Sequence, residues 1–126
     1  MVKLLKTSKK HFGYFRKRFG YWHKTFAPEF EVEYDLEFLD GRIAEVHINK
    51  NGGVATVKLS DRLHPDYLTN ESLDKTAFHE GCHLLLGRLS HEARCFLSAS
   101  YIDEIEHEII RKLENCFLGR GIDEAD

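Results

Sequence analysis

The 126-residue chain has few cysteines and no long apolar run, and these two absences exclude several classes of protein. Its three cysteines, Cys82, Cys95 and Cys116, are an odd number in a chain without a recognisable secretion signal, which favours reduced thiols and a cytoplasmic protein. No segment approaches the ~18 consecutive apolar residues of a membrane-spanning helix. The apolar segment around Lys3 and Lys6 is too short for a signal peptide. The length, with 42% hydrophobic and 31% charged residues, predicts a single soluble domain spanning the whole chain.

Acidic residues are absent from the first 28 positions, which contain eight lysines and arginines. The remainder carries ten basic and 21 acidic residues, so the net charge of −3 hides a strong separation of charge. In some proteins such a separation indicates a surface for nucleic acid or another acidic partner. In others it is only the solvated face of a basic helix that lies on an acidic body. The sequence leaves both interpretations open.

Residues 1–28 also show the periodicity of a helix. Ser8 is a suitable N-cap and Pro28 a suitable stop. Aromatic residues recur at intervals of three and four and therefore share one face, which we expect to be buried: Phe12, Phe15, Phe19, Trp22 and Phe26. Most basic side chains project from the opposite face. If nucleic acid binds this N-terminal helix, we expect contacts with phosphates and a strong dependence on salt.

Residues 29–60 carry the pattern of a β-sheet. Between Phe30 and Phe38, apolar residues alternate strictly with acidic ones, as in a strand with one buried face. The predicted strands and turns follow in order: strand 30–38, turn Asp40-Gly41, strand 42–49, turn Asn51-Gly52-Gly53 and strand 54–60. We therefore expect a three-stranded antiparallel meander with the third strand at an exposed edge, within an α+β fold.

The most informative motif is His79-Glu80-Gly81-Cys82-His83, which reads HExxH. The apolar stretches on both sides of it predict a buried helix over residues 71–90. Two imidazoles at i and i+4 of a helix point in the same direction and can bind one zinc ion. The glutamate between them lies beside the metal, where it can act as a general base. A glycine inside this helix favours either close approach of a substrate or neighbouring backbone, or tight helix packing.

A third protein ligand is needed, because a catalytic zinc site keeps its fourth position open. A second helix is predicted over residues 100–118, and Glu106 falls inside its apolar stripe. A carboxylate in an apolar core is costly unless it binds a metal or forms an ion pair, so Glu106 is the first candidate and a buried salt bridge is the alternative. His91 is a rival, although its spacing does not fit the HExxHxxGxxH pattern. A site that also used Cys82 or Cys95 would be closed and structural.

The order of these segments resembles the gluzincin class of zinc metallopeptidases, in which HExxH is followed by a glutamate on a later helix. Over residues 43–117 the chain is similar to small phage-encoded metallopeptidases, and also to SprT-like metalloproteases, which usually take a third histidine. The segments that carry the resemblance are 55–60, 76–86 and 106–114. The resemblance implies a zincin-like fold, Zn²⁺ bound by His79, His83 and Glu106, and Glu80 as the general base. It also implies a peptide or protein substrate that lies extended along the third strand.

Two other functions stay open on the sequence. The metal site could be structural, in a non-catalytic zinc-binding module, or the basic N-terminal helix could make the chain a DNA-associated regulatory protein. A peptidase also needs an oxyanion donor, for which Tyr67, Tyr101 and His107 are candidates among which the sequence does not select. His107 projects away from the face of Glu106, which favours a supporting or solvated role. The oligomeric state is likewise open.

Overall fold

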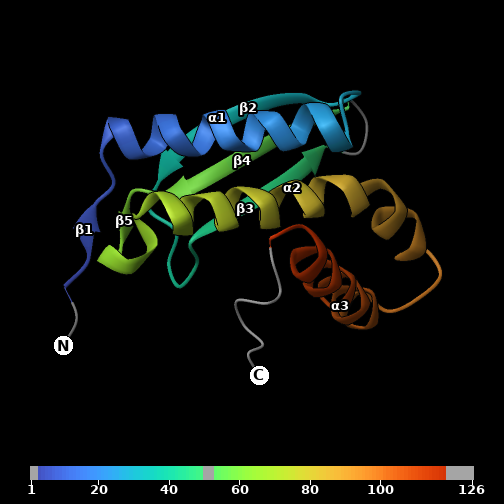
Figure 1. Cartoon of the computed structure of the whole chain (residues 1–126). Coiled ribbons are helices and arrows are strands. Elements are labelled where there is room, and N and C mark those ends of the chain that lie inside the picture. The colour runs from blue at the N-terminus through green and yellow to red at the C-terminus, as the bar shows by residue number, and fades with distance from the viewer. Residues whose placement is uncertain (1–2, 50–52, 119–126) are drawn as a thin grey trace.

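The structure, a computed structural model, describes residues 3–49 and 53–118 (Figure 1). Its elements are β1 (Leu5–Lys6), α1 (Lys9–Phe26), β2 (Glu31–Glu37), β3 (Ala44–Asn49), β4 (Val54–Ser60), β5 (Arg62–Leu63), a 3₁₀ turn η1 (Pro65–Tyr67), α2 (Asn70–Ala93) and α3 (Ala99–Phe117). The predicted α+β class is confirmed. The predicted turn at Asn51-Gly52 and the chain after Leu118 lie outside the described residues.

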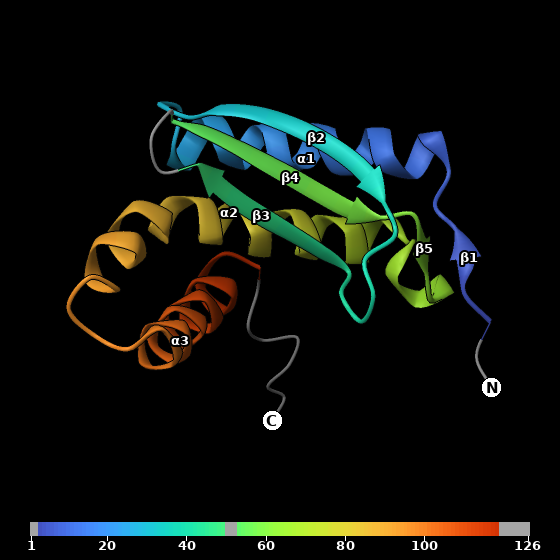
Figure 2. The same cartoon turned by 180° about the vertical axis from the view of Figure 1, so that it is seen from behind.

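Helices α1 and α2 lie side by side on one face of the three-stranded sheet, and no described element covers the other face (Figures 1 and 2). The alternation along the strands explains this arrangement. The apolar residues of β2 and β4 lie in register on the helix side: Val32, Tyr34 and Leu36 beside Ala55, Val57 and Leu59. The acidic residues of β2 lie exposed on the outer face: Glu31, Glu33, Asp35 and Glu37. One face of the sheet is therefore core and the other is solvated.

The predicted antiparallel meander is wrong. The strand order is β2-β4-β3, with β2 parallel to β4 and β3 antiparallel to it. β4, which was predicted at an exposed edge, is the central strand. It carries one charged side chain, Lys58, whereas β2 and β3 carry the acidic side chains that edge strands tolerate. The turn at Asp40-Gly41 exists, with Gly41 at φ +75°, but it belongs to a longer connection that leaves room for β4.

Side-chain caps set the beginnings of the helices. Ser8 Oγ accepts a hydrogen bond from the His11 N–H at 3.1 Å, and His11 Nδ1 accepts one from the Ser8 N–H, which confirms the predicted N-cap. α2 begins after Thr69 and α3 after Ser98, each capped by its hydroxyl. Both helices agree with the predicted ranges to within three residues. No helix in the described part of the chain is long and apolar enough to cross a membrane.

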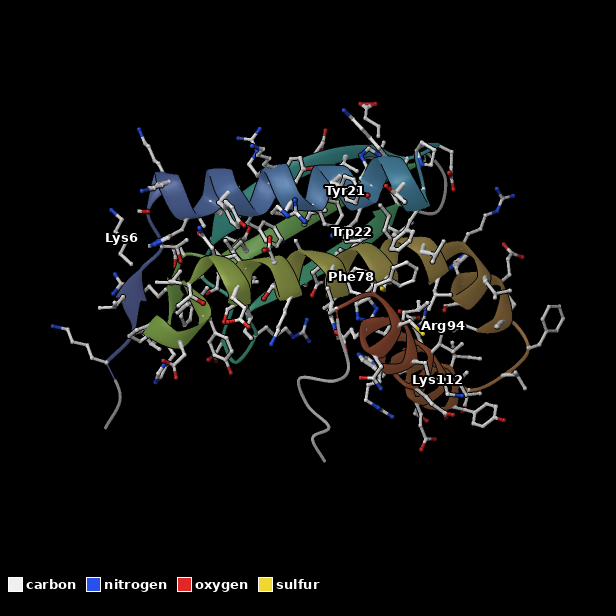
Figure 3. All side chains as sticks on the ribbon, in the orientation of Figure 1. Lys6, Tyr21, Trp22, Phe78, Arg94 and Lys112 are labelled. Atoms are coloured by element: carbon white, nitrogen blue, oxygen red, sulfur yellow. The ribbon has the colours of Figure 1, made fainter. Side chains whose placement is uncertain are left out.

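The aromatic face of α1 forms the main core, as predicted. Phe15 and Phe19 have no exposed surface. Farther along α1, Trp22 meets Phe78 of α2 edge-on, with ring centroids 4.7 Å apart (Figure 3). A Cβ atom on Gly81 would lie 2.8 Å from Trp22 Cβ, closer than real Cβ contacts allow. Close packing of α1 against α2, and not approach of a substrate, therefore explains the glycine inside HExxH.

Candidate metal centre

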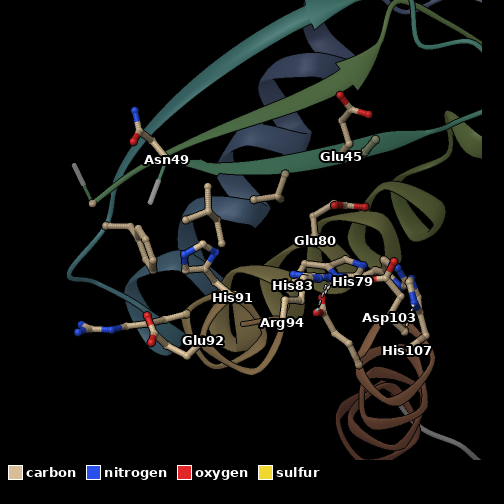
Figure 4. Close-up of a pocket in the computed structure, with 18 of the residues that line it drawn as sticks. Glu45, Asn49, His79, Glu80, His83, His91, Glu92, Arg94, Asp103 and His107 are labelled. Carbon is tan, nitrogen blue, oxygen red and sulfur yellow. Dashed lines mark hydrogen bonds and ion pairs between the residues drawn. The ribbon is translucent and has the colours of Figure 1, made fainter. Parts of the chain in front are cut away.

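Three imidazoles converge where α2 meets α3 (Figure 4). His79 and His83 come from α2 and His107 from α3. Their ring centroids lie 4.9 Å (His79–His83), 5.0 Å (His83–His107) and 6.0 Å (His79–His107) apart. One ligand atom from each ring lies within 4.8 Å of the other two, so a single ion can reach all three. Among the described residues, this is the one group of such ligand types close enough to hold a metal.

Each of the three rings is held through its Nδ1 atom. His79 Nδ1 is bonded to Glu114 Oε2 at 2.8 Å, His83 Nδ1 to Glu106 Oε2, and His107 Nδ1 to the Asp103 carbonyl at 2.8 Å. An ionised carboxylate and a carbonyl only accept hydrogen bonds, so each Nδ1 must carry the hydrogen. In the neutral ring this leaves the lone pair on Nε2, as in metal sites where an acceptor fixes the tautomer of the ligand.

The carboxylates also control the charge of the site. The hydrogen bond that His79 donates to Glu114 raises the pKa of His79, and nearby Glu80 and Glu106 act in the same direction against desolvation. Burial alone would raise the pKa of Glu106, but its hydrogen bond with His83 and the charge of Arg94 lower it overall. Glu106 therefore stays ionised in spite of its burial. A divalent cation placed among the imidazoles would meet a net negative surrounding.

Glu106 is more deeply buried than the three imidazoles and does not belong to their group. Its side chain is buried, as its place in the apolar stripe predicts, and one oxygen is bonded to His83. The other oxygen, Oε1, is buried without a hydrogen-bond partner, and Arg94 Nη2 lies 3.9 Å from it. The ion pair with Arg94 matches the buried salt bridge that the sequence analysis gave as the alternative for Glu106. Its role as a ligand stays a prediction, and the structure brings His107 into the ligand group.

The rival ligands lie elsewhere. His91 lines the same cleft two helical turns beyond His83, but it is outside the group of three imidazoles. Cys82 is fully buried against Phe78 and Ile110. Cys95 is exposed near the end of α2. Neither cysteine belongs to the ligand group found among the described residues, so these side chains do not assemble a closed four-ligand site there.

Glu80 lies between α2 and β3, on the wall of the same cleft (Figure 4). It is 6% exposed, and desolvation raises the pKa of its carboxyl while His83 and His79 lower it. Within the described residues its carboxylate forms no hydrogen bond or ion pair. By contrast, Glu45 on the facing strand is bonded to both Arg42 and His47 at 2.6 Å. Glu80 is therefore a buried, proton-accepting group beside the three imidazoles.

The cleft has a volume of about 770 Å³. Its floor is α2 with His79 and His83, and one wall is α3 with His107. The opposite wall is β3, which contributes Ala44, Val46 and Ile48. β3 pairs with β4 on one side only, so its other edge borders the cleft. Tyr67 and Tyr101, two of the predicted oxyanion donors, are exposed and do not line the cleft. The third, His107, does line it.

The sequence analysis did not predict that His107 joins the group of imidazoles or that Glu114 is the partner of His79. Neither side chain is among the buried residues of α3, but a metal site can lie at the border of a buried stripe. The sequence feature that could have indicated both residues is the interval of seven positions between them. His107 and Glu114 are two helical turns apart and so lie on the same side of α3.

Comparison of the chain with protein-family models, with curated proteins and with solved structures finds no match.

Proposed function

We propose that this chain is a zinc-dependent peptide hydrolase in which His79, His83 and His107 hold the metal and Glu80 is the general base. One observation carries the proposal. Three imidazoles whose Nδ1 atoms are fixed by acceptors converge beside a buried, unpaired glutamate in an open cleft. Three imidazoles and an open position are the ligand set of catalytic zinc sites. When bound, zinc would polarise the carbonyl of a peptide and make water a better nucleophile near neutral pH.

The remaining chemistry falls to side chains of this protein. Glu80 would accept a proton from the attacking water and deliver it to the leaving amine. Its place on the cleft wall beside the imidazoles, buried and without a hydrogen-bond partner in the described residues, supports this role. Glu114 and Glu106 would orient His79 and His83, as carboxylates commonly do behind metal-bound histidines.

The substrate is proposed to lie along β3 and not along β4, which is paired on both sides. An extended peptide can add to the open edge of a strand through backbone hydrogen bonds. β3 is such an edge, and its apolar residues Val46 and Ile48 line the same cleft as Glu80 and the imidazoles. Binding there would bring a peptide carbonyl near Glu80. The cleft is open enough for a chain, which favours a peptide over a small enclosed ligand.

The first test measures zinc content and peptide cleavage together. The wild-type protein is expected to bind about one zinc per chain and to cleave some member of a diverse peptide mixture. Glu80→Gln should keep the zinc and lose about 10²–10⁴-fold in rate, because only the base is removed. Absence of zinc even after its addition, or cleavage that persists in Glu80→Gln, would refute the proposal.

A second comparison identifies the third ligand. His107→Ala should abolish stoichiometric zinc binding, whereas Glu106→Gln should weaken it by roughly 10–100-fold, the effect expected of a residue that orients a ligand. His91→Ala serves as the control, since His91 lines the cleft without joining the ligand group. Complete loss of zinc with Glu106→Gln and retention with His107→Ala would instead give Glu106 the ligand role that the sequence predicted.

A further inference from the structure

The basic residues of the N-terminal segment form a continuous exposed face on the side of α1 that does not pack on the core. Lys10, Lys17 and Lys24 follow at intervals of seven residues, so they project in nearly the same direction, about 10 Å apart along the helix. Gly13 lies between the first two, and a Cβ atom there would meet nothing within 4 Å. The helix surface between these two lysines is therefore open at Gly13.

The charge continues beyond α1. Lys6 of β1 lies in register with Arg62 of β5, and both side chains are exposed, with Lys6 directed outward in Figure 3. On the flank of α1, Arg16 lies over the ring of Tyr34 at 5.1 Å, which holds its guanidinium near the same surface. The basic face is defined by these exposed residues: Lys3, Lys6, Lys9, Lys10, Arg16, Lys17, Lys24 and Arg62.

These charges are not neutralised by the part of the chain that the structure describes. In residues 3–49 and 53–118, no member of the basic face forms an ion pair. Lysines on other surfaces do: the half-buried Lys58 with Glu37, and the exposed Lys75 with Glu71 and Lys112 with Glu108. Arg18, the remaining basic residue of α1, is paired with Asp74 at 2.8 Å. A solvated face of a folded domain usually mixes both signs of charge, so an unpaired single-sign face favours a polyanionic partner.

The packing of α1 decides which polyanion fits. The apolar face of α1 packs in the core, where Phe15 and Phe19 are fully buried. α1 therefore cannot insert that face into a lipid surface. The same burial removes most of its aromatic rings from the bases of a single strand, which binding proteins usually stack on aromatic side chains. What is left is a straight row of ammonium groups on a convex helix. Such a row suits the regular phosphates on the outside of a duplex.

We propose that the basic face binds double-stranded DNA through its phosphates, without reading base sequence. The proposal is independent of hydrolysis, because α1 lies on the opposite side of α2 from α3, and the imidazoles lie where α2 meets α3 (Figure 1). A duplex on α1 would leave the cleft open. The acidic outer face of the sheet, with Glu31, Glu33, Asp35 and Glu37, would repel a duplex, so that binding is restricted to the side of α1.

The test is fluorescence-anisotropy titration of a labelled DNA duplex of about 25 base pairs with the full chain at several salt concentrations. Contacts with three phosphates predict affinity roughly 40-fold weaker at ~200 mM than at ~50 mM salt, and more contacts a larger loss. Lys10→Gln/Lys17→Gln/Lys24→Gln should bind at least tenfold more weakly at low salt, with a salt dependence reduced by about 2–3 in slope.

A matched control removes three positive charges elsewhere. Lys75→Gln/Arg111→Gln/Lys112→Gln changes the net charge equally on other exposed surfaces and should bind DNA within about twofold of the wild type. Circular dichroism of both variants verifies that they are folded. The proposal is overturned by no binding at low salt, by equal losses in both triple variants, or by stronger binding to single-stranded DNA, duplex RNA or vesicles of anionic lipid. Glu80→Gln should leave DNA binding unchanged, which separates this proposal from hydrolysis.

Discussion

The two sides of α2 are held in different ways. Toward α1 and the sheet, α2 contributes fully buried apolar side chains, Leu73, Ala77 and Leu84, and approaches Trp22 closely at Gly81. Toward α3 the apolar contact is a small cluster around Phe78, Cys82 and Ile110. Beside that cluster lie polar pairs between the two helices: His79–Glu114, His83–Glu106 and Arg94–Asp103.

The side of α2 that stabilises the fold is therefore different from the side that carries the polar groups of the candidate site. Apolar packing depends on shape and buried area and holds α1, the sheet and α2 together without any ligand. The interface with α3 depends more on partly buried charged groups, whose attraction is offset by the cost of removing them from water. A cation among the imidazoles would add a link between α2 and α3. We expect the side toward α3 to be the more easily loosened of the two.

The largest expected effect concerns the thiols. Burial raises the pKa of Cys82 from its ordinary 9.0 to about 12, so below pH ~9 it should form about a thousandfold less thiolate than an unperturbed thiol. In native protein, iodoacetamide should therefore label the buried Cys82 much more slowly than the exposed Cys95. Mass spectrometry of the labelled peptides measures both rates at once. Because Cys82 packs against Ile110 of α3, equal rates would mean that α3 is not docked on α2.

The next effect tests the polar side directly. Glu114→Gln replaces the carboxylate that holds His79 Nδ1 with a weaker, neutral acceptor and should lower zinc affinity by roughly 10–100-fold. Competition with a coloured chelator measures the affinity. Glu108→Gln is the matched control on the same helix, since Glu108 is exposed and is paired with the exposed Lys112. Equal affinities in the two variants would remove Glu114 from the site.

One added methyl group should weaken the apolar packing between α1 and α2. Gly81→Ala would place a Cβ atom 2.8 Å from Trp22 Cβ, which can yield only if α1 and α2 separate. We expect a loss of about 1–3 kcal/mol in the free energy of unfolding, larger than the gain of about 1 kcal/mol that alanine brings to a helix. Denaturation by urea gives the value. A stability equal to or above that of the wild type would show that the two helices are not in close contact at this position.

The smallest expected effect is a gain in stability, opposite in sign to the loss expected for Gly81→Ala. Gly13→Ala introduces the same methyl group on α1 where nothing lies within 4 Å, so only the helix preference changes. The free energy of unfolding should rise by about 0.5–1 kcal/mol. The same urea experiment serves, with Gly81→Ala as its counterpart. A loss of stability in Gly13→Ala would mean that the exposed side of α1 is covered in solution.

The sequence allowed much of the local structure to be predicted. Ser8 and the aromatic spacing predicted α1 and its buried face, alternation predicted the strand segments, and HExxH predicted a helix with His79 and His83 on one side. These features depend on contacts within a few residues, where side-chain type and periodicity are sufficient. The prediction of strand order failed, because a turn signal such as Asp40-Gly41 does not exclude a third strand inserted between its neighbours.

What the sequence by itself determined is therefore the three helices, the three longer strands, and the pair of imidazoles four residues apart; it did not predict the two-residue strands β1 and β5. Only the tertiary structure decided that β4 is central and β3 is the edge beside the cleft, that Gly81 faces Trp22, and that His107 joins the imidazoles of α2. The physical reason is that the placement of α3 against α2 depends on side chains more than 20 residues apart in the chain. No local periodicity specifies which side of α3 meets His79 and His83.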